Sequence, residues 1–290
     1  MHTFLISKNN SYVTLKDEFV YGIEPGLSVL SETPDKVPEY LNELIKVVKN
    51  VIPESKWSST PLALQATAGL RLLSKEKSNI LLEESKKCLN STGFLIKQDY
   101  IRILDGSDEG IYSWFTINYL IDKFKNENFD NIYNTVTSLD LGGSSAQLTF
   151  AISPNNDENI RSKDIHKVRI FDKNLTLYAH SFLSMGVNNA REKILQYSGI
   201  KNRLKNGDIE LYSHCVHPKI SNTEWQFGCK KYLVKNITND ETNLFSKCLK
   251  IVKKVFNKKI LNNIPSFSDR ILHAGSHYYG LALRVRNYLS

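Results

Sequence analysis

The chain has 290 residues, of which 41% are hydrophobic and 23% are charged, and its formal net charge is +8. This composition excludes a disordered or collagen-like chain, and the length allows two lobes that each bury a core of their own. No apolar stretch approaches the roughly 20 residues that a membrane-spanning helix needs, so we expect no membrane span.

The positive net charge could indicate a nucleic-acid-binding protein. However, the densest basic run, residues 247–259, alternates its lysines with Leu249, Ile251, Val252 and Phe256. That spacing predicts an amphipathic helix with a solvated basic face. We therefore expect no nucleic-acid partner. Affinity for RNA that falls steeply with salt would support the alternative.

In the first half of the chain, short strand patterns alternate with helical patterns. Strands are expected at Thr3–Ile6, Tyr12–Leu15, Leu62–Ala66, Ile101–Leu104, Val136–Leu141 and Gln147–Phe150. Helices are expected at Pro38–Val51, Ser78–Asn90 and Ile111–Lys125. Such alternation is typical of an α/β lobe in which helices flank a mixed sheet.

The polar, turn-rich segment Ser153–Asn159 is the best candidate for a boundary between lobes. We expect a first α/β lobe over residues 1–152 and a second over residues 153–290. The second would contain strands at Lys167–Asp172 and Thr176–Phe182, followed by helices at Val187–Tyr197 and Leu244–Asn257.

The most informative segment runs from Asp140 to Gln147 and reads Asp-Leu-Gly-Gly-Ser-Ser-Ala-Gln. It follows a buried strand, and its two glycines allow a sharp turn that brings backbone N–H groups against an anion. Asp140 could hold a hydrated divalent cation, and Gln147 could orient a water molecule. Ser144 and Ser145 could donate to phosphate oxygens. Taken alone, the segment could also be an ordinary turn between two strands.

Two further segments favour the phosphate interpretation. In the first, a short apolar strand ends at Thr67, Ala68 and Gly69, where a helix-compatible stretch begins, and N–H groups at a helix N-terminus suit a phosphate. In the second, residues 106–110 form a predicted turn rich in carboxylates before a buried helix. Glu109, at the mouth of that helix, is placed to act as a general base. It could equally be a helix-start acid favoured by the helix dipole.

Together these three segments resemble conserved regions of the apyrase family, the nucleoside tri- and diphosphate diphosphohydrolases. The family's second, third and fourth regions are similar, in the same order, to Leu64–Leu73, Gly106–Trp114 with Asn118–Leu120, and Asp140–Gln147. Further similarity at Ile23–Ser28, Lys56–Pro61, His180–Gly186 and Ser276–Tyr279 extends the likeness over nearly the whole chain. The third region and Glu224–Gly228 look most like the soluble branch that hydrolyses UDP and GDP in the secretory pathway.

The resemblance implies a role for each matched residue. Glu109 would take a proton from the attacking water, Gln147 would align that water, and Thr67 would line the same site. Asp140 would hold Ca²⁺ or Mg²⁺ through water. The phosphate would be bound by Gly142, Gly143, Ser144, Ala68 and Gly69. Phosphoryl transfer depends mainly on positioning and charge neutralisation, so these groups suffice chemically.

A base-binding role is implied for Tyr278 and Tyr279, which fall where the family stacks the nucleobase. Without that context, an aromatic pair near the end of an apolar segment is more often part of a core.

The resemblance also implies a two-lobe, actin-like architecture of the ribonuclease-H type. The family's first phosphate loop and its last conserved region have no counterpart in the sequence, so we expect a family member that is shortened at both ends. Such a chain would hydrolyse the terminal phosphate of UDP- or GDP-like nucleotides, or of triphosphates. Its activity would be weak, because removing one transition-state donor typically costs about 10²–10³ in rate. The alternative is a catalytically inactive nucleotide-binding member of the family.

Cysteines and glycosylation sequons bear on the compartment. The resemblance implies a disulfide between Cys215 and Cys248 and leaves Cys88 and Cys229 without an assignable partner. Sequons begin at Asn9, Asn90, Asn174 and Asn236. We expect a protein of the secretory pathway, although Met1–Ile6 is too short to be an export signal.

Overall fold

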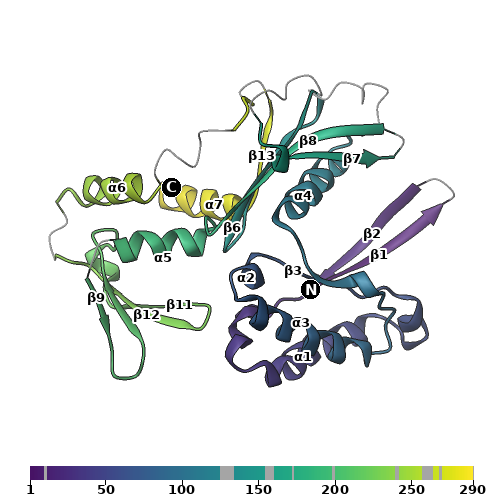
Figure 1. Cartoon of the computed structure of the whole chain (residues 1–290), viewed down its shortest axis with the longest axis horizontal. Helices are drawn as coiled ribbons and strands as arrows, with labels where there is room; N and C mark the ends of the chain where they lie inside the picture. Colours follow the sequence, from purple (N-terminus) through teal and green to yellow (C-terminus); the bar gives the residue numbers. More distant parts are fainter. Residues whose placement is uncertain are drawn as a thin grey trace. The chain divides into compact units, whose positions relative to one another are not determined.

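The computed structural model describes residues 1–9, 12–124, 134–153, 160–171, 173–197, 200–238, 242–256, 264–267 and 270–289 (Figure 1). The chain divides into two compact units, Met1–Ile103 and Leu104–Ser290. The predicted α/β class is confirmed by helices that alternate with several sheets. The boundary predicted near residue 153 lies within the second unit, and it stays a prediction, as does the actin-like arrangement of two lobes.

A pair of helices forms the core of the first unit. In α1 (Val37–Val51), the buried residues Val37, Leu41, Ile45 and Val48 recur every three or four positions and so share one face. This face packs on α3 (Lys75–Asn90), which contributes Leu81, Cys88 and Leu89 to the same core. The helix α3 begins at Ser74, whose hydroxyl accepts a hydrogen bond from the Lys77 N–H and so caps the helix.

The strands of the first unit form two small sheets. The strands β1 (His2–Asn9) and β2 (Tyr12–Val20) pair as an antiparallel ribbon, and β3 (Leu64–Ala66) pairs in parallel with β4 (Ile101–Ile103). A single turn of helix, α2 (Ala68–Arg71), follows β3. The buried side chains of Ala66, Leu70 and Ile101 join β3, α2 and β4 to the helical core.

The second unit contains a sheet of five strands in the order β13-β5-β6-β8-β7. Their bounds are Leu272–Ser276 for β13, Thr137–Leu141 for β5, Ser145–Ile152 for β6, Lys173–Leu183 for β8 and Ile165–Ile170 for β7. The strand β13 runs parallel to β5, whereas the other neighbours are antiparallel. One helix follows β13, α7 (His277–Leu289).

The helix α4 (Gly106–Leu120) packs on β6 and β8, with the fully buried Trp114 seated against Ala151 and Leu177. The turn predicted over residues 106–110 is wrong, because these residues form the first turn of α4. The cause is Asp105, whose carboxylate accepts a hydrogen bond from the Ser107 N–H at 2.8 Å and so caps a helix that begins at Gly106 and not at Ile111 as expected.

A smaller sheet, with the order β11-β12-β10-β9, lies against α5 (Val187–Tyr197). Its strands are Ile200–Arg203 for β9, Ile209–Tyr212 for β10, Thr223–Phe227 for β11 and Lys230–Lys235 for β12. Leu195 of α5 packs on Leu211 and Tyr232 of the sheet.

The expected amphipathic helix is present as α6 (Leu244–Val255), although residues 257–259 of the basic run lie outside the described residues. The implied disulfide between Cys215 and Cys248 ties α6 to the segment after β10. Cys88 and Cys229 form no disulfide. Within the described ranges, every helix is too short or too polar to cross a membrane.

One buried tyrosine behind the central sheet predicts how the fold responds to alkali. Tyr178 is 0% exposed, and its hydroxyl has no hydrogen-bond partner among the described residues. Burial, reinforced by the nearby charge of Asp164, raises the pKa of Tyr178 to about 12. The folded chain disfavours the phenolate form of Tyr178. The stability that depends on the neutral phenol is therefore complete below about pH 10 and is lost as the pH rises towards about 12.

We therefore expect Tyr178→Phe to keep or raise the melting temperature at pH 7, because it removes an unpaired buried hydroxyl. The loss of stability between about pH 10 and 12 should be smaller in this variant than in the wild type. Thermal denaturation followed by circular dichroism across that range measures both effects. Tyr197→Phe, at a tyrosine that is 52% exposed, serves as the control. An unchanged alkaline loss in Tyr178→Phe would contradict the assignment.

Candidate active site

The register of the central sheet places a row of residues across its strands. Asp140 of β5 lies opposite Gln147 of β6, which in turn lies opposite Ser181 of β8. Gly275 of β13 completes the row beside Asp140. Paired residues on neighbouring strands project from the same face of a sheet. Since Gln147 contacts α4, the row lies on the face that α4 covers.

The amide of Gln147, which is 3% exposed, is the centre of this row. Three oxygens lie within hydrogen-bond distance of its nitrogen Nε2, which has two hydrogens to donate: Ser145 Oγ at 2.8 Å, Ser181 Oγ at 3.1 Å and Glu109 Oε2 at 3.2 Å. An ionised carboxylate only accepts hydrogen bonds, so the amide nitrogen and not the oxygen faces Glu109. The amide oxygen Oε1 is buried and has no partner in the described part of the chain. A bound water molecule is the kind of donor that satisfies such an acceptor.

Close packing of α4 on the sheet brings Glu109 to Gln147. A Cβ atom at Gly110 would lie 2.6 Å from Thr149 Oγ1 and 3.2 Å from Gln147 Cβ, so only glycine fits without a shift. Further along α4, the fully buried Asn118 exchanges hydrogen bonds with the backbone of Val136, just before β5. These two contacts fix α4 against the sheet, and with it the Glu109 carboxylate.

The turn between β5 and β6 is shaped to present N–H groups. It is closed by a 2.9 Å hydrogen bond from the Gly142 N–H to the Ser145 carbonyl. The carbonyls of Gly142, Gly143 and Ser144 accept, in that order, from the N–H groups of Val187, Asn188 and Ser184. In contrast, the N–H groups of Gly143 and Ser144 meet no acceptor within the described ranges. They are therefore available to an anion such as a phosphate.

Gly186, between β8 and α5, makes room for this turn. A Cβ atom there would lie 2.4 Å from Gly143 C, 2.4 Å from Ser144 N and 2.5 Å from Ser145 N. All three are backbone atoms and cannot move aside as a flexible side chain would. The shape of the turn therefore depends on the absence of a side chain at position 186.

Asp140 is held at the start of α7. Ser276 Oγ donates to Asp140 Oδ1, and His277 Nδ1 lies 2.8 Å from the Leu141 carbonyl oxygen. Burial, together with the Asp140 charge, raises the pKa of the Tyr278 phenol, which shows that Tyr278 lies near that carboxylate. Tyr279 is 67% exposed. The base-binding role of both tyrosines stays a prediction.

The remaining predicted site residues lie in the first unit, at the junction of β3 and α2. The Thr67 carbonyl accepts hydrogen bonds from the Leu70 and Arg71 N–H groups, so Thr67 begins the helical turn. Ala68 is 3% exposed, and a Cβ atom at Gly69 would lie 3.3 Å from Ser28 Oγ. The local geometry is thus the predicted strand-to-helix turn. The part that Thr67, Ala68 and Gly69 play in catalysis or phosphate binding stays a prediction.

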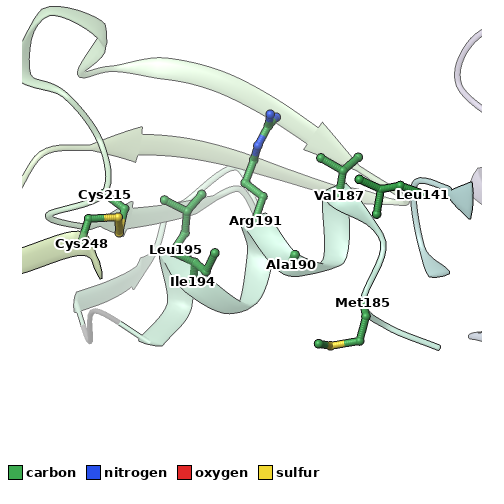
Figure 2. A pocket seen from close by; sticks show the side chains of 9 residues that line it. All are labelled: Leu141, Met185, Val187, Ala190, Arg191, Ile194, Leu195, Cys215 and Cys248. Atoms are coloured by element: carbon green, nitrogen blue, oxygen red, sulfur yellow. A yellow bond between two sulfur atoms is a disulfide. The ribbon is translucent and has the colours of Figure 1, made fainter. Parts of the chain in front are cut away.

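A cavity of about 410 Å³ in the second unit lies beside Leu141, next to the turn (Figure 2). Its lining is apolar apart from Arg191, and the Cys215–Cys248 disulfide forms one end. Figure 2 shows Arg191 and Met185 extending in opposite directions from their backbone. No side chain that lines the cavity carries a carboxylate, hydroxyl or amide group, so it lacks the groups that hydrolysis requires. The polar row on the sheet, and not this cavity, is the candidate active site.

The sequence alone indicated Glu109, Gln147 and Asp140. In the structure, Asp140 and Gln147 lie in the row on the sheet, and Glu109 reaches Gln147 from the covering helix α4. Sequence reasoning gave no individual role to Ser181 and Gly186, although both lie in the segment His180–Gly186 that carries part of the family resemblance. A local signal for Ser181 was a small hydroxyl residue between the ring side chains of His180 and Phe182 in β8. That signal becomes informative only when the register of β6 and β8 is known.

Comparison with known proteins assigns the chain to a family. Residues 1–278 match the model of the GDA1/CD39 (nucleoside phosphatase) family, and the chain belongs to this family. The predicted resemblance is therefore confirmed.

Over 285 residues the chain is 33% identical to ectonucleoside triphosphate diphosphohydrolase 5 of Gallus gallus, covering 97% of this chain and 64% of the relative. Over 286 residues it is 32% identical to nucleoside diphosphate phosphatase ENTPD5 of Homo sapiens, covering 98% and 64%. Among solved structures, nucleoside triphosphate hydrolases from Neospora caninum match with a TM-score of 0.46 at 16% identity, over 84% of this chain and 50% of that chain. The chain thus spans 64% of the length of each of the two curated relatives.

The contact of Gly186 with the turn predicts that Gly186→Ala will be destabilising. The added methyl group overlaps backbone atoms, and overpacking of this kind typically costs about 1–3 kcal/mol. The melting temperature should fall by several degrees, as measured by calorimetry. The matched control is Gly280→Ala in α7, where an added Cβ meets nothing within 4 Å. Equal melting temperatures for the two variants would show that the turn does not depend on Gly186.

Proposed function

We propose that this chain hydrolyses the terminal phosphate of nucleoside diphosphates, with UDP- and GDP-like substrates preferred, by direct attack of water. Membership of the nucleoside phosphatase family supports the reaction class. The observation that carries the proposal is the amide of Gln147, whose nitrogen is bound to Glu109 and whose buried oxygen lacks a partner in the described ranges. The N–H groups of Gly143 and Ser144, which meet no backbone acceptor among the described residues, lie in the adjacent turn.

In the proposed reaction, the Gly143 and Ser144 N–H groups donate to oxygens of the terminal phosphate. The attacking water donates one hydrogen bond to Gln147 Oε1, and Glu109 accepts its other proton as the bond to phosphorus forms. Nε2 of the same amide is bound to Glu109. A water molecule on Oε1 is therefore separated from the base only by the Gln147 amide group. The nucleoside monophosphate then leaves. Positioning and charge neutralisation provide most of the catalysis in phosphoryl transfer.

The donor set suits a hard divalent cation. Asp140 neighbours Gln147 in the row, and no group of three or more His, Cys, Asp or Glu side chains gathers around a common point in the described ranges. A cation would therefore be held by Asp140 through water and by phosphate oxygens, as suits Mg²⁺ or Ca²⁺. When bound, it would neutralise part of the phosphate charge.

We also infer an oxidising compartment, in agreement with the secretory pathway expected from the sequence. The Cys215–Cys248 disulfide supports it, since disulfides persist in such compartments. Asn90 and Asn174 are exposed and could carry glycans. Asn236 could not in this fold, because it is 8% exposed and its amide donates to the Val216 carbonyl. The Asn9 sequon includes Ser11, which lies outside the described residues.

Replacing the proposed base tests the reaction. Phosphate release from UDP, GDP, ADP and ATP would be measured with Mg²⁺ or Ca²⁺ and with an EDTA control. We expect Glu109→Gln to lower kcat by about 10²–10⁴, because general base catalysis is lost. Asp108→Asn makes the same change of charge one residue away in α4 and should keep near wild-type activity. Equal losses in both variants would contradict the role of Glu109.

A folded wild-type chain that releases no phosphate would overturn the proposed hydrolysis. If nucleotides still raised its melting temperature, the chain would instead be a nucleotide-binding member of the family without turnover.

The cation site has a separate test. We expect Asp140→Asn to raise the Mg²⁺ or Ca²⁺ concentration that gives half-maximal phosphate release by about tenfold or more, because a neutral amide is a weaker ligand than a carboxylate. Titration of each ion at saturating nucleotide measures the shift. An unchanged requirement would place the cation elsewhere.

A further inference from the structure

The hydroxyl of Ser181 contacts the same amide nitrogen of Gln147 that binds Glu109. The Ser181 hydroxyl oxygen lies 3.1 Å from Gln147 Nε2, and the two residues are direct partners in the pairing of β6 and β8. We propose that Ser181 is a positioning residue that fixes the orientation of the Gln147 amide and, through it, the attacking water. This inference rests on the proposed hydrolysis.

The need for such a residue follows from the symmetry of an amide. The last torsion of a glutamine side chain has two nearly equivalent orientations, which exchange the places of the oxygen and the nitrogen. Only one of them leaves Oε1 in the buried position without a partner, where it can receive a water. In the other orientation, that position would hold an NH₂ group, which cannot accept a hydrogen bond from the water. Catalysis therefore needs the amide held in one orientation throughout the reaction.

Glu109 cannot supply this hold alone. While ionised it accepts from Nε2, but after taking a proton from water it carries a donor that could bind the amide oxygen instead. The ionised Glu109 selects the orientation at the start, because a carboxylate only accepts, and the hydrogen bonds from Nε2 to the serine hydroxyls persist when Glu109 takes up a proton, because these hydroxyls do not change charge. With Ser145 and Ser181 both within reach, each of the two Nε2 hydrogens retains an acceptor whatever the state of Glu109.

The position of the Ser181 hydroxyl is itself fixed by the sheet. On the opposite face of β8, the neighbouring His180 contacts the Asp164 carboxylate at 2.7 Å, and Asp164 also binds Arg161 at 2.7 Å. The Asp164 side chain is only 4% exposed, so this contact is shielded from water. A strand that is anchored at the adjacent residue presents Ser181 to Gln147 with little freedom.

Ser181 also differs from Ser145 in a way that an experiment can use. Ser145 belongs to the phosphate turn, because its carbonyl closes that turn, so a change there would disturb phosphate binding as well. Ser181 lies on another strand. Its loss should therefore lower kcat and leave KM nearly unchanged.

The test compares Ser181→Val with Ser181→Thr. The two side chains have the same shape, suit a strand equally and differ only in the hydroxyl group. We expect the Val variant to lose about fivefold to tenfold in kcat, the usual effect of one hydrogen bond, with KM within about twofold of wild type. The Thr variant should retain most of the wild-type kcat. A Val variant with wild-type kcat, or a Thr variant as impaired as Val, would overturn the proposal.

A double-mutant cycle with Gln147→Ala separates positioning from general structure. If Ser181 acts through Gln147, adding Ser181→Val to Gln147→Ala should change kcat by less than about twofold. A full fivefold loss in that background would overturn the proposal. Ser181→Ala replaces the Val variant in the cycle if the added methyl groups prevent folding. Phosphate release by the wild-type chain is measured alongside. If the wild type releases no phosphate, the proposed hydrolysis is rejected. If it releases phosphate and the Ser181 variants match it, only the role of Ser181 is rejected.

Discussion

The packing of α4 on the central sheet is the contact on which the candidate active site depends. At Gly110 the helix comes so close to β6 that a single methyl group would collide with Thr149. That closeness lets the Glu109 carboxylate reach the Gln147 amide from a different element of the chain. A helix shifted outward by about one ångström would break the 3.2 Å hydrogen bond between the amide and the proposed base.

The turn between β5 and β6 is likewise held in place by another segment of the backbone. The carbonyls of the turn accept hydrogen bonds from the backbone after β8, whereas the N–H groups of Gly143 and Ser144 meet no backbone acceptor in the part of the chain that the structure describes. The segment that makes these contacts includes Gly186 and leads directly into α5. Both halves of the proposed site thus rely on glycines that let one backbone approach another, and neither glycine needs to touch the substrate.

Much of this could be predicted from the sequence, because the site residues lie in short segments whose order and spacing carry meaning on their own. Asp140, the glycine turn and Gln147 lie within eight residues, and Glu109 belongs to a recognisable run of carboxylates. The prediction failed at the N-terminus of α4. Asp105 begins α4 early and converts a predicted turn into helix. The structural roles of Ser181 and of the buried Asn236 could not be assigned, since they depend on strand register and burial that no local pattern encodes.

The pairing of β13 with β5 has a consequence for how the protein is made. These strands are neighbours in the sheet, yet residues 142–271 separate them along the chain. During synthesis from the N-terminus, β5 leaves the ribosome with one edge bare, and Ser276, which binds Asp140, emerges only after residues 142–271 have been made. Non-local parallel pairing of this kind is slow and leaves strand edges open to wrong partners. The nascent chain therefore carries this aspartate without its serine partner while residues 142–271 are made, in the interval when a chaperone would protect it best.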